Sequence, residues 1–127
     1  MSKTFSIINE TTSELPKLPF QAIKEASLGK KYSLNLIITT SKQIEKLNTI
    51  YRDKEYPTDI LSFPISDNEG EIYISLAETK KEAVKFERTF ENFLAFLFIH
   101  GCVHLKGYDH SSTMEDIEVD LRKQFKV

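Results

Sequence analysis

The sequence predicts an α+β fold, in which helices pack on a small sheet. Short segments rich in Ile, Leu and Thr alternate with helical patterns up to residue 76, and helical periodicity follows from Ala77 onward. The chain has 127 residues, of which 40% are hydrophobic, and this suits one domain with its own core. No repeat or linker-like segment divides the chain, so we expect a single domain over residues 1–127.

The first half of the chain is expected to form strands at 4–10, 33–40, 59–65 and 71–76, with helices at 18–28 and 41–51. Thr40 and Gln43 have the spacing of a capping box at the start of the second helix. Ile44, Leu47 and Ile50 follow it on what we expect to be one apolar face.

Prolines and a polar turn define the boundaries of the later strands. Pro64 lies near the end of the segment 59–65, and because proline cannot donate to a sheet ladder, this strand is predicted at a sheet edge. The turn that follows is expected over 67–70. Three further helices are predicted at 77–86, 89–106 and 112–125, and the apolar run 93–99 is expected to be core packing.

Composition limits the class of protein. The net charge of −2 argues against nonspecific coating of nucleic acid, although one local basic groove remains compatible with it. The single cysteine, Cys102, excludes an internal disulfide and fits a reducing compartment. The run 93–99 is shorter than the roughly 20 residues that a membrane span needs, and the first residues do not resemble a signal peptide. We therefore expect a cytoplasmic protein that does not contact membranes.

All three histidines lie in the segment HGCVHLKGYDH, residues 100–110. His100 and His104 are four residues apart, which places them on one face of a helix. Gly107 follows the expected helix end, where a left-handed residue would let the chain turn and bring His110 to the same point. Three protein ligands with one open position are typical of catalytic zinc sites. The alternatives are histidines without a shared role, or a closed structural site with a fourth ligand.

A fourth protein ligand is not obvious in this segment. Cys102 would point about 200° around the helix from His100. Asp109 is adjacent to a residue that already serves as a ligand. We therefore favour an open three-histidine site, which predicts one divalent metal per chain, with Zn²⁺ as first choice and Ni²⁺ or another transition metal as alternatives.

The spacing of the histidines is also that of the metzincin proteases, apart from one position. Those enzymes carry a glutamate directly after the first histidine, and it acts as the general base of peptide hydrolysis. Gly101 occupies that position here. The sequence therefore predicts the ligand set without the peptidase base, and proteolysis is not expected.

The segment 100–110 resembles the signature of the YbeY family, bacterial endoribonucleases of ribosomal RNA maturation. A second segment, YRDKEYPTDILSFP at 51–64, and a third, GEIYIS at 70–75, are also similar to motifs of that family and occur in the same order. Departures are small: Glu55 and Glu71 stand where aspartates are usual, and Val103 replaces a leucine.

The resemblance implies a zincin-like α+β fold with a mixed four-stranded sheet and a metal site on a C-terminal helix, residues 89–106, and the loop that follows it. It implies a metal bound by His100, His104 and His110, and an Arg52 that faces the same cleft. It also implies processing of ribosomal RNA, notably the 3′ end of the small-subunit RNA, and ribosome quality control.

Phosphodiester hydrolysis assigns roles to these residues. A metal-bound water supplies a nucleophile near neutral pH, and the planar fork of Arg52 matches a phosphate. His100 is then both ligand and part of the catalytic centre. Asp59, Ser62 and Asp109 are candidates to take a proton or to orient a histidine. For Asp59, capping of a turn or strand end is an equally good explanation.

Three functions are compatible with these patterns. The first is a metal-dependent endoribonuclease acting on single-stranded RNA, with ribosomal RNA and the ribosome or its small subunit as partners and no DNA. The second is a hydrolase of small esters or peptides that uses the same ligands. The third is a noncatalytic ribosome-assembly factor in which the metal stabilises the fold.

Overall fold

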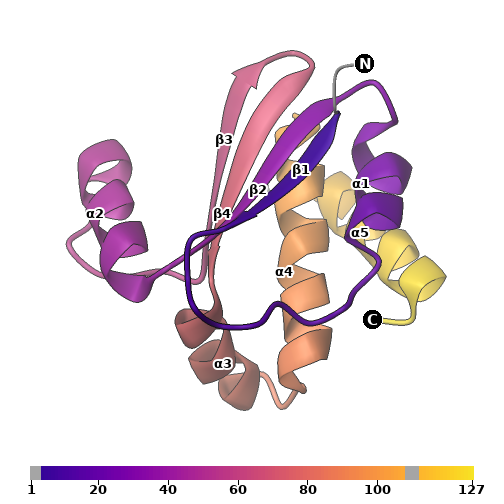
Figure 1. Ribbon diagram of the computed structural model, residues 1–127. Helices are drawn as coiled ribbons and strands as arrows, with labels where there is room; N and C mark the ends of the chain where they lie inside the picture. Colours follow the sequence, from indigo (N-terminus) through magenta and orange to yellow (C-terminus); the bar gives the residue numbers. More distant parts are fainter. Residues whose placement is uncertain (1–3, 108–111) are drawn as a thin grey trace.

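A mixed sheet with the strand order β1-β2-β4-β3 forms the centre of the computed structural model, which describes residues 4–107 and 112–127 (Figure 1). The elements of this part are β1 (Phe5–Asn9), α1 (Phe20–Leu28), β2 (Ser33–Thr39), α2 (Ser41–Arg52), β3 (Ile60–Ser66), β4 (Glu69–Ser75), α3 (Leu76–Lys85), α4 (Phe90–Leu105) and α5 (Ser112–Phe125). Strand β2 pairs parallel with β1 and β4, whereas β3 pairs antiparallel with β4. The predicted mixed four-stranded sheet and the predicted order of strands and helices are confirmed.

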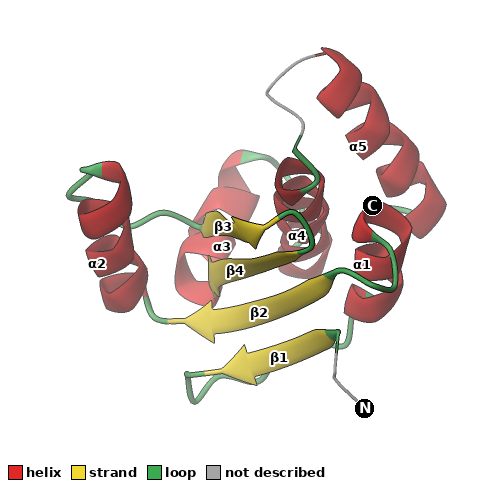
Figure 2. Ribbon diagram, turned by 90° about the horizontal axis from the view of Figure 1, so that it is seen from above, coloured by secondary structure: helices red, strands yellow, loops and turns green. Residues whose placement is uncertain are grey.

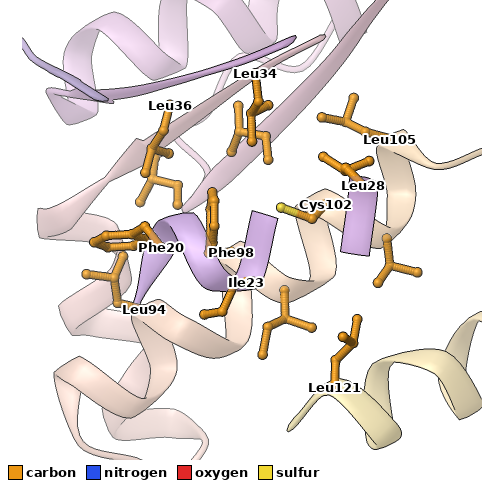
Figure 3. Close-up of a cluster of buried hydrophobic side chains, with 14 of the residues drawn as sticks. Phe20, Ile23, Leu28, Leu34, Leu36, Leu94, Phe98, Cys102, Leu105 and Leu121 are labelled. Carbon is orange, nitrogen blue, oxygen red and sulfur yellow. The ribbon is translucent and has the colours of Figure 1, made fainter. Parts of the chain in front are cut away.

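One face of the sheet carries the core. Leu34, Leu36 and Ile38 alternate along β2, and Ile72 and Ile74 lie opposite the last two of them on β4; all five are fully buried. Helices α1 and α4 cover this face, and α5 packs against both helices (Figures 1 and 3). The expectation that the run 93–99 packs in the core is confirmed, because only Phe96 of that run is not buried. Each buried leucine or isoleucine stabilises the fold by about 1.5–3 kcal/mol, so α4 is held firmly on the sheet.

Cys102 lies in this core, beside residues of α1 and β2 (Figure 3). Its side chain is fully buried, and burial raises the pKa of the thiol to about 12. A thiol in this environment stays protonated at neutral pH and is a poor metal ligand. The prediction that Cys102 points away from the histidines agrees with this location.

Strand β3 lies at an edge of the sheet, as Pro64 predicts. The pairing of β3 with β4 shifts register between Pro64 and Ser66. The predicted turn over 67–70 is too long, since Glu69 and Gly70 already belong to β4 and only residues 67–68 remain outside the strands.

Helix α2 stands on the side of the sheet away from α1, α4 and α5 in both ribbon views (Figures 1 and 2). It begins as predicted, with the Thr40 hydroxyl accepting a hydrogen bond from the backbone N–H of Gln43 at 3.1 Å. The predicted apolar face is wrong at Ile50, which is 62% exposed, whereas Ile44 and Asn48 are buried. Because α2 touches the rest of the fold along one narrow stripe, the third residue of the expected face has nothing to pack against.

None of the helices in the described part of the chain combines the length and apolar character that a membrane crossing requires.

Candidate active site

Helix α4 carries His100 and His104 one turn apart near its C-terminal end. The helix begins where the Thr89 hydroxyl accepts a hydrogen bond from the backbone N–H of Asn92 at 3.1 Å. The centroids of the two imidazole rings are 6.5 Å apart, and the ring planes are 22° from parallel. The two side chains therefore share one face of α4, as their spacing predicts.

The helix ends at Leu105, and Gly107 adopts the predicted left-handed conformation with φ of 99°. The predicted third ligand, His110, and the candidate Asp109 lie outside the described residues. Within residues 4–107 and 112–127, no three His, Cys, Asp or Glu side chains gather closely enough to hold a metal ion. The three-histidine site therefore stays a prediction, of which the structure describes two members.

A carboxylate that the sequence did not point to contacts the first histidine. Oε1 of Glu118, on α5, lies 2.6 Å from Nδ1 of His100. The Glu118 side chain is only 11% exposed and that of His100 is 32% exposed. A signal was present in the sequence: Met114, Glu118 and Leu121 form one helical stripe, and all three are buried. A glutamate within an apolar stripe indicates a specific partner.

A hollow of about 730 Å³ opens beside His100, between α3, α4 and α5. We call it the His100 hollow; its lining combines apolar and aromatic side chains with carboxylates and one arginine, namely Asp59, Ile60, Glu82, Phe86, Phe93, Phe96, Leu97, His100, Met114, Glu115, Glu118 and Arg122. A second hollow of about 350 Å³ shares Asp59 and Glu82 with the first and reaches Tyr56. Together they connect the histidine helix with the loop that follows α2.

Asp59 thus lies in the same hollow as His100, which the sequence could only suggest. Burial raises the pKa of its carboxyl group, and the nearby Glu82 carboxylate raises it further. The Thr58 hydroxyl and two backbone N–H groups act in the opposite direction. Desolvation and a like charge favour the protonated form, which is the environment of many catalytic acids and bases.

Gly101 and Ser62 lie where α4 approaches the sheet. A Cβ atom on Gly101 would lie 2.9 Å from Cδ1 of Ile60, 3.0 Å from Oγ of Ser62 and 3.1 Å from Cδ1 of Ile72. The position that carries the catalytic glutamate in metzincins therefore faces the sheet here. Ser62 therefore lies between the sheet and α4, next to Gly101, the residue that follows His100.

Arg52 is the last residue of α2 and is exposed. Asp53 follows it in the left-handed conformation, with φ of 56°, and its backbone N–H bonds the carbonyl oxygens of Asn48 and Thr49. The buried Asn48 side chain donates to the backbone oxygen of Tyr56 at 2.9 Å and thereby holds the loop. Arg52 is not among the residues that line the His100 hollow. That its guanidinium points into the same cleft as the histidines therefore stays a prediction.

Comparison with known proteins gives a consistent answer. The family model described as Endoribonuclease YbeY matches residues 2–125. The chain belongs to this family. The proteins named Endoribonuclease YbeY from Onion yellows phytoplasma and Petrotoga mobilis are 38% and 36% identical to it, over 85% and 96% of this chain and 76% and 88% of the relative. The relative from Acholeplasma laidlawii is 35% identical over 91% of this chain and 78% of its own length.

The fold agrees as well. The solution structure of TM1509 from Thermotoga maritima superimposes with a TM-score of 0.61 and 25% identity, covering 96% of this chain and 91% of the other. The resemblance to the YbeY family that the segments 51–64, 70–75 and 100–110 carry is therefore confirmed. The His100 hollow contains the first histidine of the segment 100–110, which carries part of this resemblance.

Proposed function

We propose that this chain is a metal-dependent endoribonuclease that cleaves single-stranded RNA during ribosomal RNA maturation. The observation that supports it most directly is the pair His100 and His104 on one face of α4, with His100 lining the His100 hollow, in a chain of the YbeY family. Ribosomal RNA, the small subunit and its RNA 3′ end are the proposed targets, and the cytoplasm is the proposed location.

The donor set fits a divalent transition metal such as zinc. His100 and His104 present two imidazoles from one helical face, and the hydrogen bond between His100 and Glu118 engages Nδ1, so we propose Nε2 of His100 as the ligand atom. We propose His110 as the third ligand. When bound, such a metal lowers the pKa of a coordinated water and polarises a phosphoryl oxygen.

The other residues would bind and orient the RNA. We propose that Arg52 holds a phosphate through its guanidinium fork. The support is the match of the segment 51–64 to the family, since Arg52 is not among the residues that line either hollow. Asp59, whose raised pKa suits proton transfer, is the preferred candidate for a base or acid, with Ser62 and Asp109 as alternatives.

Phe86, the exposed end of an aromatic stack, offers a surface on which bases could stack next to these groups. Phe86, Phe93 and Phe96 stack in series, with ring centroids 5.3 Å and 5.5 Å apart, and Phe86 is 59% exposed. Bases stack on aromatic side chains without needing a particular sequence. The carboxylates of the hollow repel phosphates, so we place the bases there and the backbone toward Arg52.

The decisive experiment compares RNA cleavage by wild-type protein, metal-stripped protein and the His100→Ala variant. We expect both altered samples to lose metal and to cleave single-stranded RNA at no more than background, while casein is not cleaved by any of them. Wild-type protein that binds the small subunit but cleaves no RNA would favour the assembly-factor function. Chelator-sensitive cleavage of casein would favour the peptide hydrolase.

A further inference from the structure

Glu118 contributes a buried carboxylate to the candidate metal site from a different helix. Its Oε1 atom lies 2.6 Å from Nδ1 of His100, eighteen residues earlier in the chain. The residue is 9% exposed overall. A carboxylate loses much of its hydration on burial and is stable there only with a strong partner.

The neighbours of Glu118 on α5 show that packing alone does not require a carboxylate there. Met114 and Leu121, on the same stripe, are 1% and 7% exposed and belong to the core cluster. Arg122 directs its guanidinium over the Phe96 ring, with Cζ 5.0 Å from the centroid. An apolar residue at position 118 would continue the stripe, so the carboxylate is explained by His100.

The hydrogen bond decides which nitrogen of His100 carries the proton. An ionised carboxylate only accepts hydrogen bonds, so Nδ1 carries the hydrogen, and in the neutral ring Nε2 then has the lone pair. Metal-binding histidines commonly donate their second N–H to a carboxylate, which fixes the ring and makes the ligand nitrogen more basic.

We infer that Glu118 is a positioning residue of the metal site, which holds His100 in the Nδ1–H form and in the orientation that binds a divalent metal. The inference rests on the metal site of the proposed function, and it extends that site to α5. The packing of α5 on α4, which buries Met114 and Leu121, then contributes to the metal affinity because it holds Glu118 in place.

The test uses zinc alone as the probe and measures its affinity by competition with a chromophoric chelator. Glu118→Ala should bind zinc about 10–100-fold more weakly than wild type. Glu118→Gln keeps an oxygen that accepts from Nδ1–H, so it should recover most of the affinity. Asp120→Asn, an exposed acid two residues later on the same helix, removes the same charge and should bind like wild type.

A second readout needs no metal. The ¹⁵N shifts of His100 in metal-free protein should report the Nδ1–H form in wild type, Glu118→Gln and Asp120→Asn, and a mixture of both forms in Glu118→Ala. Thermal unfolding of each variant shows the temperature below which it is folded, and the measurements are made below it. If Glu118→Ala does not fold, the comparison of Glu118→Gln with wild type still tests the inference.

The outcomes separate this inference from the nuclease proposal. Equal zinc affinity in wild type and Glu118→Ala, with an unchanged histidine form, would overturn the positioning role and leave Glu118 as a tie between helices. A Gln variant as weak as the Ala variant would also overturn it, in favour of direct ligation by the carboxylate. Zinc binding that depends on Glu118 without RNA cleavage would refute the nuclease and leave the inference intact.

Discussion

The two motifs that mark the family lie in regions that the fold holds in different ways. His100 and His104 lie on α4, between the sheet and α5, and His100 is tied to Glu118. Arg52 lies at the exposed end of α2, between Tyr51 and a loop whose Tyr56 is 54% exposed. The histidines are held by the packing of α4 between the sheet and α5, whereas Arg52 is exposed beside a few local contacts, among them the Tyr51 ring on the Phe63 ring.

This difference predicts two kinds of mutational effect. On α4, a substitution changes packing and the candidate metal site together, because the same helix supports both. At the end of α2, a substitution should change the handling of substrate and leave the fold alone, since exposed side chains away from special contacts alter stability by less than about 0.5 kcal/mol. Substitutions at Arg52, Gly101 and Tyr32 test the contrast, beginning with the largest expected effect.

Arg52→Ala should reduce RNA cleavage by roughly 10²–10³-fold, because a charged contact to the transition state is lost. Zinc content and the midpoint of thermal unfolding should remain those of wild type. Arg52→Lys keeps the charge without the fork and should recover only part of the rate. The matched control is Lys46→Ala, an exposed cation on the same helix, which should cleave normally. Normal cleavage by Arg52→Ala would make Arg52 an ordinary surface residue and reduce the site to the α4 region.

Gly101→Ala should act mainly on stability, at the opposite side of α4 from solvent. The added methyl group would meet Ile60, Ser62 and Ile72 at 2.9–3.1 Å, and overpacking of this kind costs about 1–3 kcal/mol. The better helix propensity of alanine offsets about 1 kcal/mol of this. Chemical denaturation should therefore show a net loss of up to about 2 kcal/mol by these two terms.

A second substitution checks the cause of that loss. Ile60→Val deletes the Cδ1 atom that lies closest to the added methyl group. The double variant should be more stable than the sum of the two single losses predicts, because the two sites are in contact. Additive losses would show that α4 packs less tightly on the sheet than the distances indicate.

The sequence predicted the features that depend on local contacts and missed those that depend on contacts between distant segments. The pairing of His100 with His104 and the left-handed Gly107 were predictable, because helix geometry fixes them over a few residues. The partner Glu118 was not, since it depends on how α5 packs on α4. Ile50 was assigned to a buried face for a related reason: periodicity shows which residues share a side, but not whether anything covers it.

Asp59 shows the intermediate case. Its place in the second motif suggested a role, and the fold brings it into the His100 hollow by pairing β3 with β4 beneath α4. The raised pKa could not be predicted, because it arises from burial and from Glu82, which belongs to α3. Residues whose environment is built by several elements become interpretable only in the folded chain.

The smallest expected effect concerns Tyr32, which tests how tightly the C-terminal end of α4 is packed. Its hydroxyl is buried near Gly70, as is the Leu105 side chain of α4, and has no hydrogen-bond partner in the described part of the chain. Removing an unpaired buried hydroxyl relieves a desolvation cost, so Tyr32→Phe should be neutral or up to about 1 kcal/mol more stable in chemical denaturation.

Burial raises the pKa of Tyr32 above its ordinary value of 10.0, so the unfolded chain loses this proton first as the pH rises. The contribution is therefore complete below about pH 10 and is lost above it, and the phenylalanine variant should lose less stability in alkaline solution than wild type. A loss of stability at neutral pH would mean that the hydroxyl has a partner, and that this end of α4, unlike the Gly101 contact, is held by a polar interaction.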